Sequence, residues 1–174
     1  MRLLVISFRF LIYLPISLLS IFKLIFHNKF LLIDLDYSLC SNNLEDKSYM
    51  LDYKDPHLEL NEDLKKIINN YNIAGYENII FSSRGLRAIP FSKRWLRRNN
   101  INYNAFFHLG LTSLKIIPLL FSLILLKEFI LLDDLSNIKD KELKKSFIYN
   151  LVESFKISKR FKWLDPQRQN YENF

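Results

Sequence analysis

The stretch FLLIDLDYS, residues 30–38, joins a short apolar run to two aspartates and a serine. An uninterrupted apolar run that ends in an acid is typical of a buried parallel strand, because both faces of such a strand are covered by other layers. We therefore predict a strand at Phe30–Asp34 that delivers Asp34, Asp36 and Ser38 at its carboxyl end.

Two later segments repeat this pattern. NIIF at 78–81 is followed by Ser82, Ser83 and Arg84, and FILL at 129–132 is followed by Asp133 and Asp134. Helical spacing of apolar residues lies between them at 58–71, 90–99 and 113–127, and a further strand is expected at 101–107. Alternating strands and helices predict an α/β fold with a Rossmann-like, mainly parallel sheet, whose polar strand ends gather at one edge.

Residues 1–27 form a predicted N-terminal apolar helix without an acidic residue. Its longest uncharged stretch, Phe10–Phe22, has thirteen residues, whereas a bilayer span needs roughly 20. We therefore expect a segment that stays at a membrane, either as a clean span or as a tilted, kinked or interfacial helix. The alternative is a helix buried in the core or in a dimer.

The net charge of +7 is concentrated after residue 80. Two basic runs without acids cover 84–98 and 156–162, and each is either a solvated face or a site for an anionic partner. Aromatic residues interleave with the second run, so residues 141–174 are expected to be a basic amphipathic tail that lies on a membrane or packs on the core. The single cysteine excludes an internal disulfide, and the three histidines lack zinc-ligand spacing.

A single DxD triplet or acid pair is commonly a cap or a turn. In this order, however, the three strand ends resemble the motif set of the haloacid dehalogenase superfamily. FSSRG at 81–85 and KRWLRRNNINYNAFF at 93–107 are similar to the corresponding segments in the phosphatase domain of polynucleotide kinase-phosphatases. The resemblance covers residues 29–138.

This resemblance implies a phosphohydrolase site. Asp34 matches the nucleophile that forms an aspartyl-phosphate, Asp36 the general acid and base, and Ser82 the hydroxyl that binds the phosphoryl group. Lys115, at the start of the apolar helix, is the predicted lysine that pairs with phosphate and nucleophile. Two departures are Tyr37, in place of the usual glycine, and Ser38, in place of threonine. The remaining expectations are Mg²⁺ held by Asp34, Asp36, Asp133 and Asp134, and substrate binding by Ser38, Ser83 and Arg84.

The expected organisation is a membrane-associated segment at 1–27, a phosphohydrolase core at 28–140 and the tail at 141–174. Only 43 residues separate Ser38 from Ser82, so little or no cap domain fits, and the resemblance then implies an open site for large phosphates. We predict a phosphatase for a glycan- or lipid-linked phosphate at the cytoplasmic side of a membrane. The alternatives are a nucleic-acid end phosphatase and a non-catalytic membrane adaptor.

Overall fold

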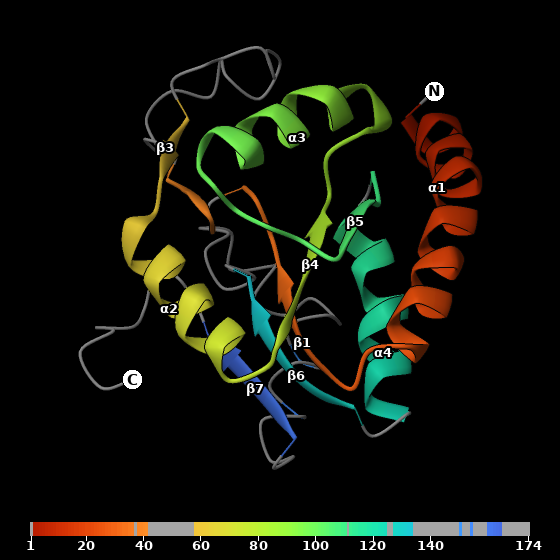
Figure 1. The fold of residues 1–174 in the computed structure, drawn as a ribbon. Helices are drawn as coiled ribbons and strands as arrows, with labels where there is room; N and C mark the ends of the chain where they lie inside the picture. The colour runs from red at the N-terminus through yellow and green to blue at the C-terminus, as the bar shows by residue number, and fades with distance from the viewer. Residues whose placement is uncertain are drawn as a thin grey trace.

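A five-stranded parallel sheet forms the centre of the protein (Figure 1). The computed structural model describes residues 2–36, 38–41, 58–110, 112–124, 127–133, 150, 154 and 160–164. In these ranges the strand order is β5-β4-β1-β6-β7, which confirms the predicted α/β fold with a Rossmann-like sheet. The strands are β1 (Lys29–Ile33), β4 (Glu77–Ser82), β5 (Ala105–His108), β6 (Glu128–Leu132) and β7 (Phe161–Leu164).

The central strand β1 pairs with β4 on one side and with β6 on the other. The chain runs from β1 to β4 and β5 on one side and then crosses over to β6 on the other side. The order of the strands therefore reverses between β1 and β6, and the carboxyl ends of strands at such a point are where α/β sheets bind ligands. A separate antiparallel pair, β2 (Cys40–Ser41) and β3 (Glu59–Leu60), follows β1 and precedes the first crossover helix.

Helices cover both faces of the sheet (Figure 1). Alternate β1 side chains point to opposite faces, with Phe30 and Leu32 in one core cluster and Leu31 and Ile33 in the other. The first cluster lies beneath α1 (Arg2–Ile25) and α4 (Ile116–Ile124), and the second beneath α2 (Glu62–Ile73) and α3 (Ile89–Arg98). Two short 3-10 helices, η2 (Leu86–Ala88) and η3 (Thr112–Lys115), precede α3 and α4.

Helix α2 starts later than the sequence predicts. Asn61 is its N-cap, and the Asn61 side chain accepts a hydrogen bond from the backbone N–H of Leu64 at 3.0 Å. This cap satisfies a backbone donor that the first helical turn leaves unpaired. The two residues before the cap, Glu59 and Leu60, are paired in β3 instead.

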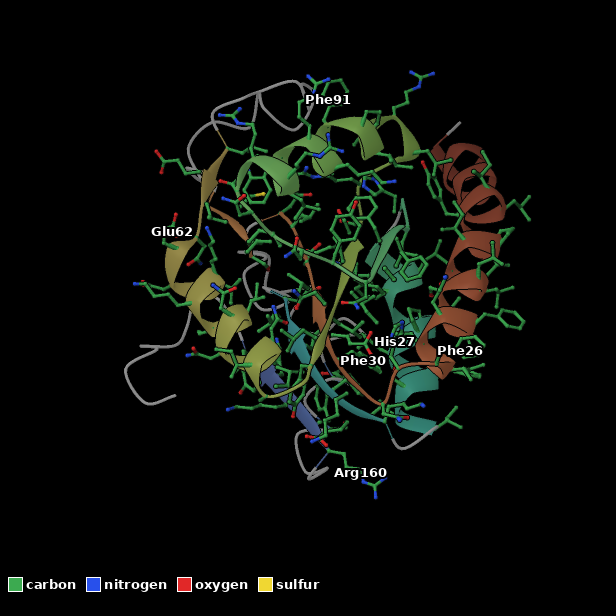
Figure 2. The ribbon with its side chains drawn as sticks, in the orientation of Figure 1. Phe26, His27, Phe30, Glu62, Phe91 and Arg160 are labelled. Carbon is green, nitrogen blue, oxygen red and sulfur yellow. The ribbon has the colours of Figure 1, made fainter. Side chains whose placement is uncertain are left out.

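Helix α1 is packed on the sheet through one of its faces. Leu24 is buried, the Ser17 hydroxyl donates to the Leu114 carbonyl at 3.0 Å, and the Tyr13 hydroxyl accepts from the Leu86 N–H at 3.0 Å. The inner face thus matches the alternative of a core helix. The outer face exposes large apolar side chains, including Leu19 and Phe22, and Figure 2 shows Phe26, in the turn that follows α1, pointing away from the sheet.

Membrane contact of that outer face stays a prediction. Over the residues that the structure describes, no helix combines the length and the apolar character needed to cross a bilayer.

The strand β7 is absent from the sequence expectations, which placed its residues in a C-terminal tail. Phe161 pairs with Phe129 and Leu164 with Leu132, parallel to β6. Phe161, Trp163 and Leu164 are buried, and Lys162 is partly exposed. The neighbouring lysines and arginine make this short strand look like part of a basic helix.

Candidate active site at the carboxyl edge of the sheet

Asp34 is the first residue beyond the central strand. Its backbone N–H donates to the Leu132 carbonyl at 2.9 Å, which extends the ladder between β1 and β6 by one residue. The chain then turns, and the Cys40 N–H donates to the Leu35 carbonyl at 2.7 Å. The Asp34 side chain is consequently fixed at the sheet edge and is only 5% exposed.

A buried lysine connects Asp34 to the end of the neighbouring strand. Lys115 Nζ lies 2.7 Å from Asp34 Oδ2 and 2.7 Å from Asp133 Oδ2. The lysine comes from η3, on the helical layer that contains α1 and α4, and its Nζ also lies 5.7 Å from the centre of the Phe81 ring. The structure therefore brings together three of the residues that the sequence assigned to the site.

The electrostatics of this cluster follow from its burial. Burial lowers the pKa of Lys115, but Asp133 and Asp34 outweigh it and hold that pKa above its ordinary value. Burial raises the pKa of Asp34, Lys115 opposes this, and the charges of Asp133 and Asp36 raise it further. The carboxylates thus need a cation here, and Lys115 provides one.

One oxygen of Asp34 is left over. Oδ2 accepts from Lys115, whereas Oδ1 is buried and has no hydrogen-bond partner within the described part of the chain. An unpaired buried carboxylate oxygen is costly. Such an atom is suited either to an electrophile that enters the site or to a bound cation.

Asp36 is held by Arg84, which lies beyond the end of β4. Arg84 Nε donates to both Asp36 oxygens at 3.0 Å, and Nη2 donates to Oδ1 at 2.5 Å. The same guanidinium donates from Nη1 to Ser92 Oγ of α3 at 3.0 Å. The Arg84 side chain is 4% exposed and that of Asp36 is 25% exposed, so the pair lies at the outer side of the site.

The predicted serines lie around these carboxylates. Ser82 is buried at the end of β4, and its Oγ accepts the Arg84 backbone N–H at 3.2 Å. Ser38 is buried in the turn after β1, where its carbonyl accepts from the Asn61 side chain at 3.4 Å. Ser83 is partly exposed between Ser82 and Arg84. Asp134 and Tyr37 lie outside the described residues.

The residues present are compatible with a divalent cation at Asp34. The carboxylates of Asp34, Asp36 and Asp133 gather at this edge, and Asp34 Oδ1 has no hydrogen-bond partner among the residues that the structure describes. Mg²⁺ prefers one or two carboxylates together with substrate oxygens and waters. In the described part of the chain, no group of three or more His, Cys, Asp or Glu side chains forms a ready metal cluster. Both Asp36 oxygens accept from Arg84, so a role for the Asp36 carboxylate as a metal ligand stays a prediction.

Sequence reasoning missed three side chains that support this edge. Ser92 anchors Arg84, and Trp163 Nε1 of β7 donates to the Asp133 carbonyl at 2.9 Å. His108 ends β5 beside Ser82, with Nδ1 2.9 Å from the Gly85 carbonyl. Its Nε2 is buried, and no described residue forms a hydrogen bond with it. The position of His108 at a predicted strand end was the one available signal; nothing local marks Ser92 or Trp163.

Chains from two solved structures align with this chain, and the first of them shares its fold. A chain from the structure of the Pnkp1/Rnl/Hen1 complex aligns with a TM-score of 0.52 and 18% identity, over 80% of this chain and 46% of that chain. A chain from the structure of the Pnkp1/Rnl/Hen1 RNA repair complex aligns with a TM-score of 0.48 and 24% identity, over 67% of this chain and 40% of that chain. The present chain thus spans less than half of either. No protein-family model and no curated protein matches the sequence.

Proposed function

We propose that this chain is a Mg²⁺-dependent phosphomonoester hydrolase in which Asp34 is the nucleophile. The observation that carries the proposal is the environment of Asp34: one oxygen is fixed by a buried lysine, and the other is buried and has no partner among the described residues. The order of motifs at the strand ends, which resembles the haloacid dehalogenase superfamily, gives independent support.

The proposed reaction has two steps. Asp34 Oδ1 attacks the phosphorus of the monoester, the bond to the ester oxygen breaks, and an acyl phosphate forms on Asp34. Water then attacks the phosphorus of this intermediate and releases inorganic phosphate. In this proposal the hydroxyl of Ser82 and the ammonium of Lys115 bind the phosphoryl oxygens. A bound Mg²⁺ would neutralise charge on those oxygens.

Asp36 is the proposed proton carrier. It would give a proton to the leaving oxygen in the first step and take one from water in the second. As observed, both Asp36 oxygens accept hydrogen bonds from Arg84, which suits the acceptor role in the second step. Donation in the first step requires that Asp36 releases at least one of these bonds.

A phosphate at the end of a nucleic acid is the substrate class that we place first. The fold is shared with a chain of the Pnkp1/Rnl/Hen1 complex, and α3 beside the site carries exposed basic side chains. A glycan- or lipid-linked phosphate, the first expectation from the sequence, gains no support from these comparisons. The exposed apolar face of α1 is the feature that favours it.

Turnover measurements test the assignment. We expect the full chain with Mg²⁺ to release phosphate from an aryl phosphate and from a 3′-phosphorylated oligonucleotide, and the Asp34→Asn variant to lose about 10³-fold in rate, roughly 4 kcal/mol in barrier. Asp63→Asn, which removes an exposed carboxylate on α2, is the matched control and should keep the rate. Full activity of Asp34→Asn would reject the nucleophile, and no turnover of any ester by the wild type would favour a non-catalytic adaptor.

A further inference from the structure

Helix α3 separates apolar and basic side chains onto two faces. Ser92, Trp95 and Leu96 are buried, and the Trp95 indole N–H donates to the Leu58 carbonyl at 2.9 Å. The opposite face exposes cations, and η2 adds one more just before it. The exposed basic residues are Arg87, Lys93, Arg94, Arg97 and Arg98.

Helix stability explains only part of this basic face. Arg97 and Arg98 lie in the last turn, where positive charge interacts favourably with the helix dipole. Lys93 and Arg94 have no such benefit, and each is four residues before another cation, a spacing at which like charges repel. The sequence contains no acidic residue from 78 to 127 that could offset this charge locally. An anionic ligand would neutralise it.

The basic face is rigidly connected to the candidate site. Arg84 donates to Ser92 on the buried side of α3 and simultaneously holds Asp36. Figure 1 shows α3 beyond the carboxyl end of β4 and extending toward β3. Helix α3, which carries these charges on its outer side, therefore lies beside the edge of the sheet at which Asp34 lies.

We propose that the exposed face of α3 binds the sugar–phosphate backbone of a single-stranded nucleic acid whose terminal phosphate enters the site at Asp34. This inference rests on the proposed function and names the substrate that the site would take. Guanidinium groups bind phosphate through paired hydrogen bonds, and a row of them along one helix suits the repeated phosphates of a polynucleotide.

The chemistry of α3 favours a polynucleotide over a lipid surface. A helix that lies on a membrane needs an apolar face toward the lipid. In α3, Trp95 and Leu96 are instead buried in the core, Ile89 and Phe91 are partly buried, and no large apolar residue of this helix is exposed.

Affinity for RNA with hydroxyl ends tests this surface separately from catalysis, because such RNA contains no phosphomonoester. Fluorescence anisotropy with a labelled single strand of about twelve nucleotides would be compared for the full wild-type chain and for the double variant Lys93→Gln/Arg94→Gln. We expect the affinity to fall about tenfold or more, and the slope of log K against log salt to become shallower by about 1.4, at about 0.7 per lost contact.

The matched control removes the same charge elsewhere. Lys23→Gln/Lys29→Gln alters two exposed lysines near the start of β1, at the opposite edge of the sheet. We expect its RNA affinity to stay within about twofold of the wild type, because the contacts and not the net charge determine binding. DNA of the same length should bind in the same way, since phosphate contacts do not distinguish the sugars.

Three results would overturn the inference: equal losses in the two double variants, unchanged affinity in Lys93→Gln/Arg94→Gln, or binding to anionic vesicles without binding to RNA. Urea midpoints would verify that both double variants are folded. If Lys93→Gln/Arg94→Gln is unfolded, the RNA affinity of the single variant Arg87→Gln tests the same surface. A failed Asp34→Asn test would reject the phosphatase and leave this affinity measurement valid.

Discussion

Lys115 Nζ and Asp34 Oδ2 are 2.7 Å apart at a site where both side chains are almost completely buried. The lysine is 81 positions later in the chain and reaches Asp34 from a 3-10 helix that enters the layer opposite α2 and α3. The contact therefore requires the complete sheet and its covering layer. The charge balance of the buried carboxylates and the chemistry proposed for the site consequently both depend on Lys115.

Lys115→Met should destabilise the fold strongly. The variant removes the buried cation that contacts both Asp34 and Asp133, and losing one partner of a buried ion pair costs roughly 3–5 kcal/mol. Urea unfolding at neutral pH measures the loss. Lys66→Met, which removes an exposed surface pair with Asp63, should leave the midpoint nearly unchanged.

The deficit of Lys115→Met should also shrink as the pH falls. Protonation of the uncompensated carboxyls removes their charge, so the folded variant gains protons that the unfolded chain still lacks. A deficit that grows on acidification would contradict the assignment of Lys115 as the cation that balances Asp34 and Asp133.

Gly110→Ala should loosen the contact between α1 and the sheet. Gly110 has φ +68°, and an added Cβ would lie 2.3 Å from Tyr13 Cε2. Gly75 has φ +86° and open space around the same position, so Gly75→Ala reports backbone strain alone. We expect Gly110→Ala to cost about 1–3 kcal/mol more than Gly75→Ala in chemical unfolding, the usual penalty for overpacking.

Removal of the ring provides the check. On a Tyr13→Ala background the additional cost of Gly110→Ala should largely disappear, because the clashing atoms are gone. Persistence of the full cost would mean that Tyr13 is not seated against Gly110 and that α1 does not dock as described.

His108 should make the fold sensitive to mild acid. Burial lowers its pKa to about 4; the positive charge of Arg84 acts in the same direction, while the Gly85 carbonyl and Asp36 oppose it. An unfolded histidine titrates near 6.5. Between these values the unfolded chain binds a proton that the folded chain does not, so stability falls as the pH decreases, by at most about 1.4 kcal/mol per pH unit.

The variant His108→Asn isolates this contribution. Asparagine keeps a donor that can reach the Gly85 carbonyl and cannot become charged. Unfolding free energies from urea titrations between the two pKa values should therefore depend less on pH in the variant. Identical pH dependence in the two proteins would show that His108 takes up its proton without unfolding.

The buried part of the sheet could be predicted because local pattern determines it. FLLID, NIIF and FILL are continuous apolar runs, and strands covered on both faces have this signature. The positions of Asp34, Ser82 and Asp133 at one edge then follow from parallel pairing. Lys115 could be predicted because the segment between it and Asp133 is long enough for one helix and one strand. The structure shows its contact with Asp34, and its role in catalysis stays a prediction.

The remaining features depend on contacts between distant segments. β7 is four residues long, and the cations within it and before it make its sequence resemble a basic helix. Only its pairing with β6 identifies it as a strand. The apolar residues of α1 fit a membrane helix and a core helix equally well. Contacts such as the hydrogen bond from Ser17 to the Leu114 carbonyl show that the inner face of α1 packs on the core. The hydrogen-bonded ion pair of Arg84 and Asp36 joins residues 48 positions apart, so no local sequence pattern could predict it.

The most direct test of the nucleophile is a search for the phosphorylated enzyme itself. The full chain would be mixed with an aryl phosphate and Mg²⁺, quenched in acid within one turnover, digested and analysed by mass spectrometry. We predict that the peptide containing Asp34 carries the mass of one phosphoryl group, and that hydroxylamine, which cleaves acyl phosphates, removes it. Phosphate release without any phosphorylated peptide, or with the phosphoryl group on another residue, would contradict the assignment of Asp34.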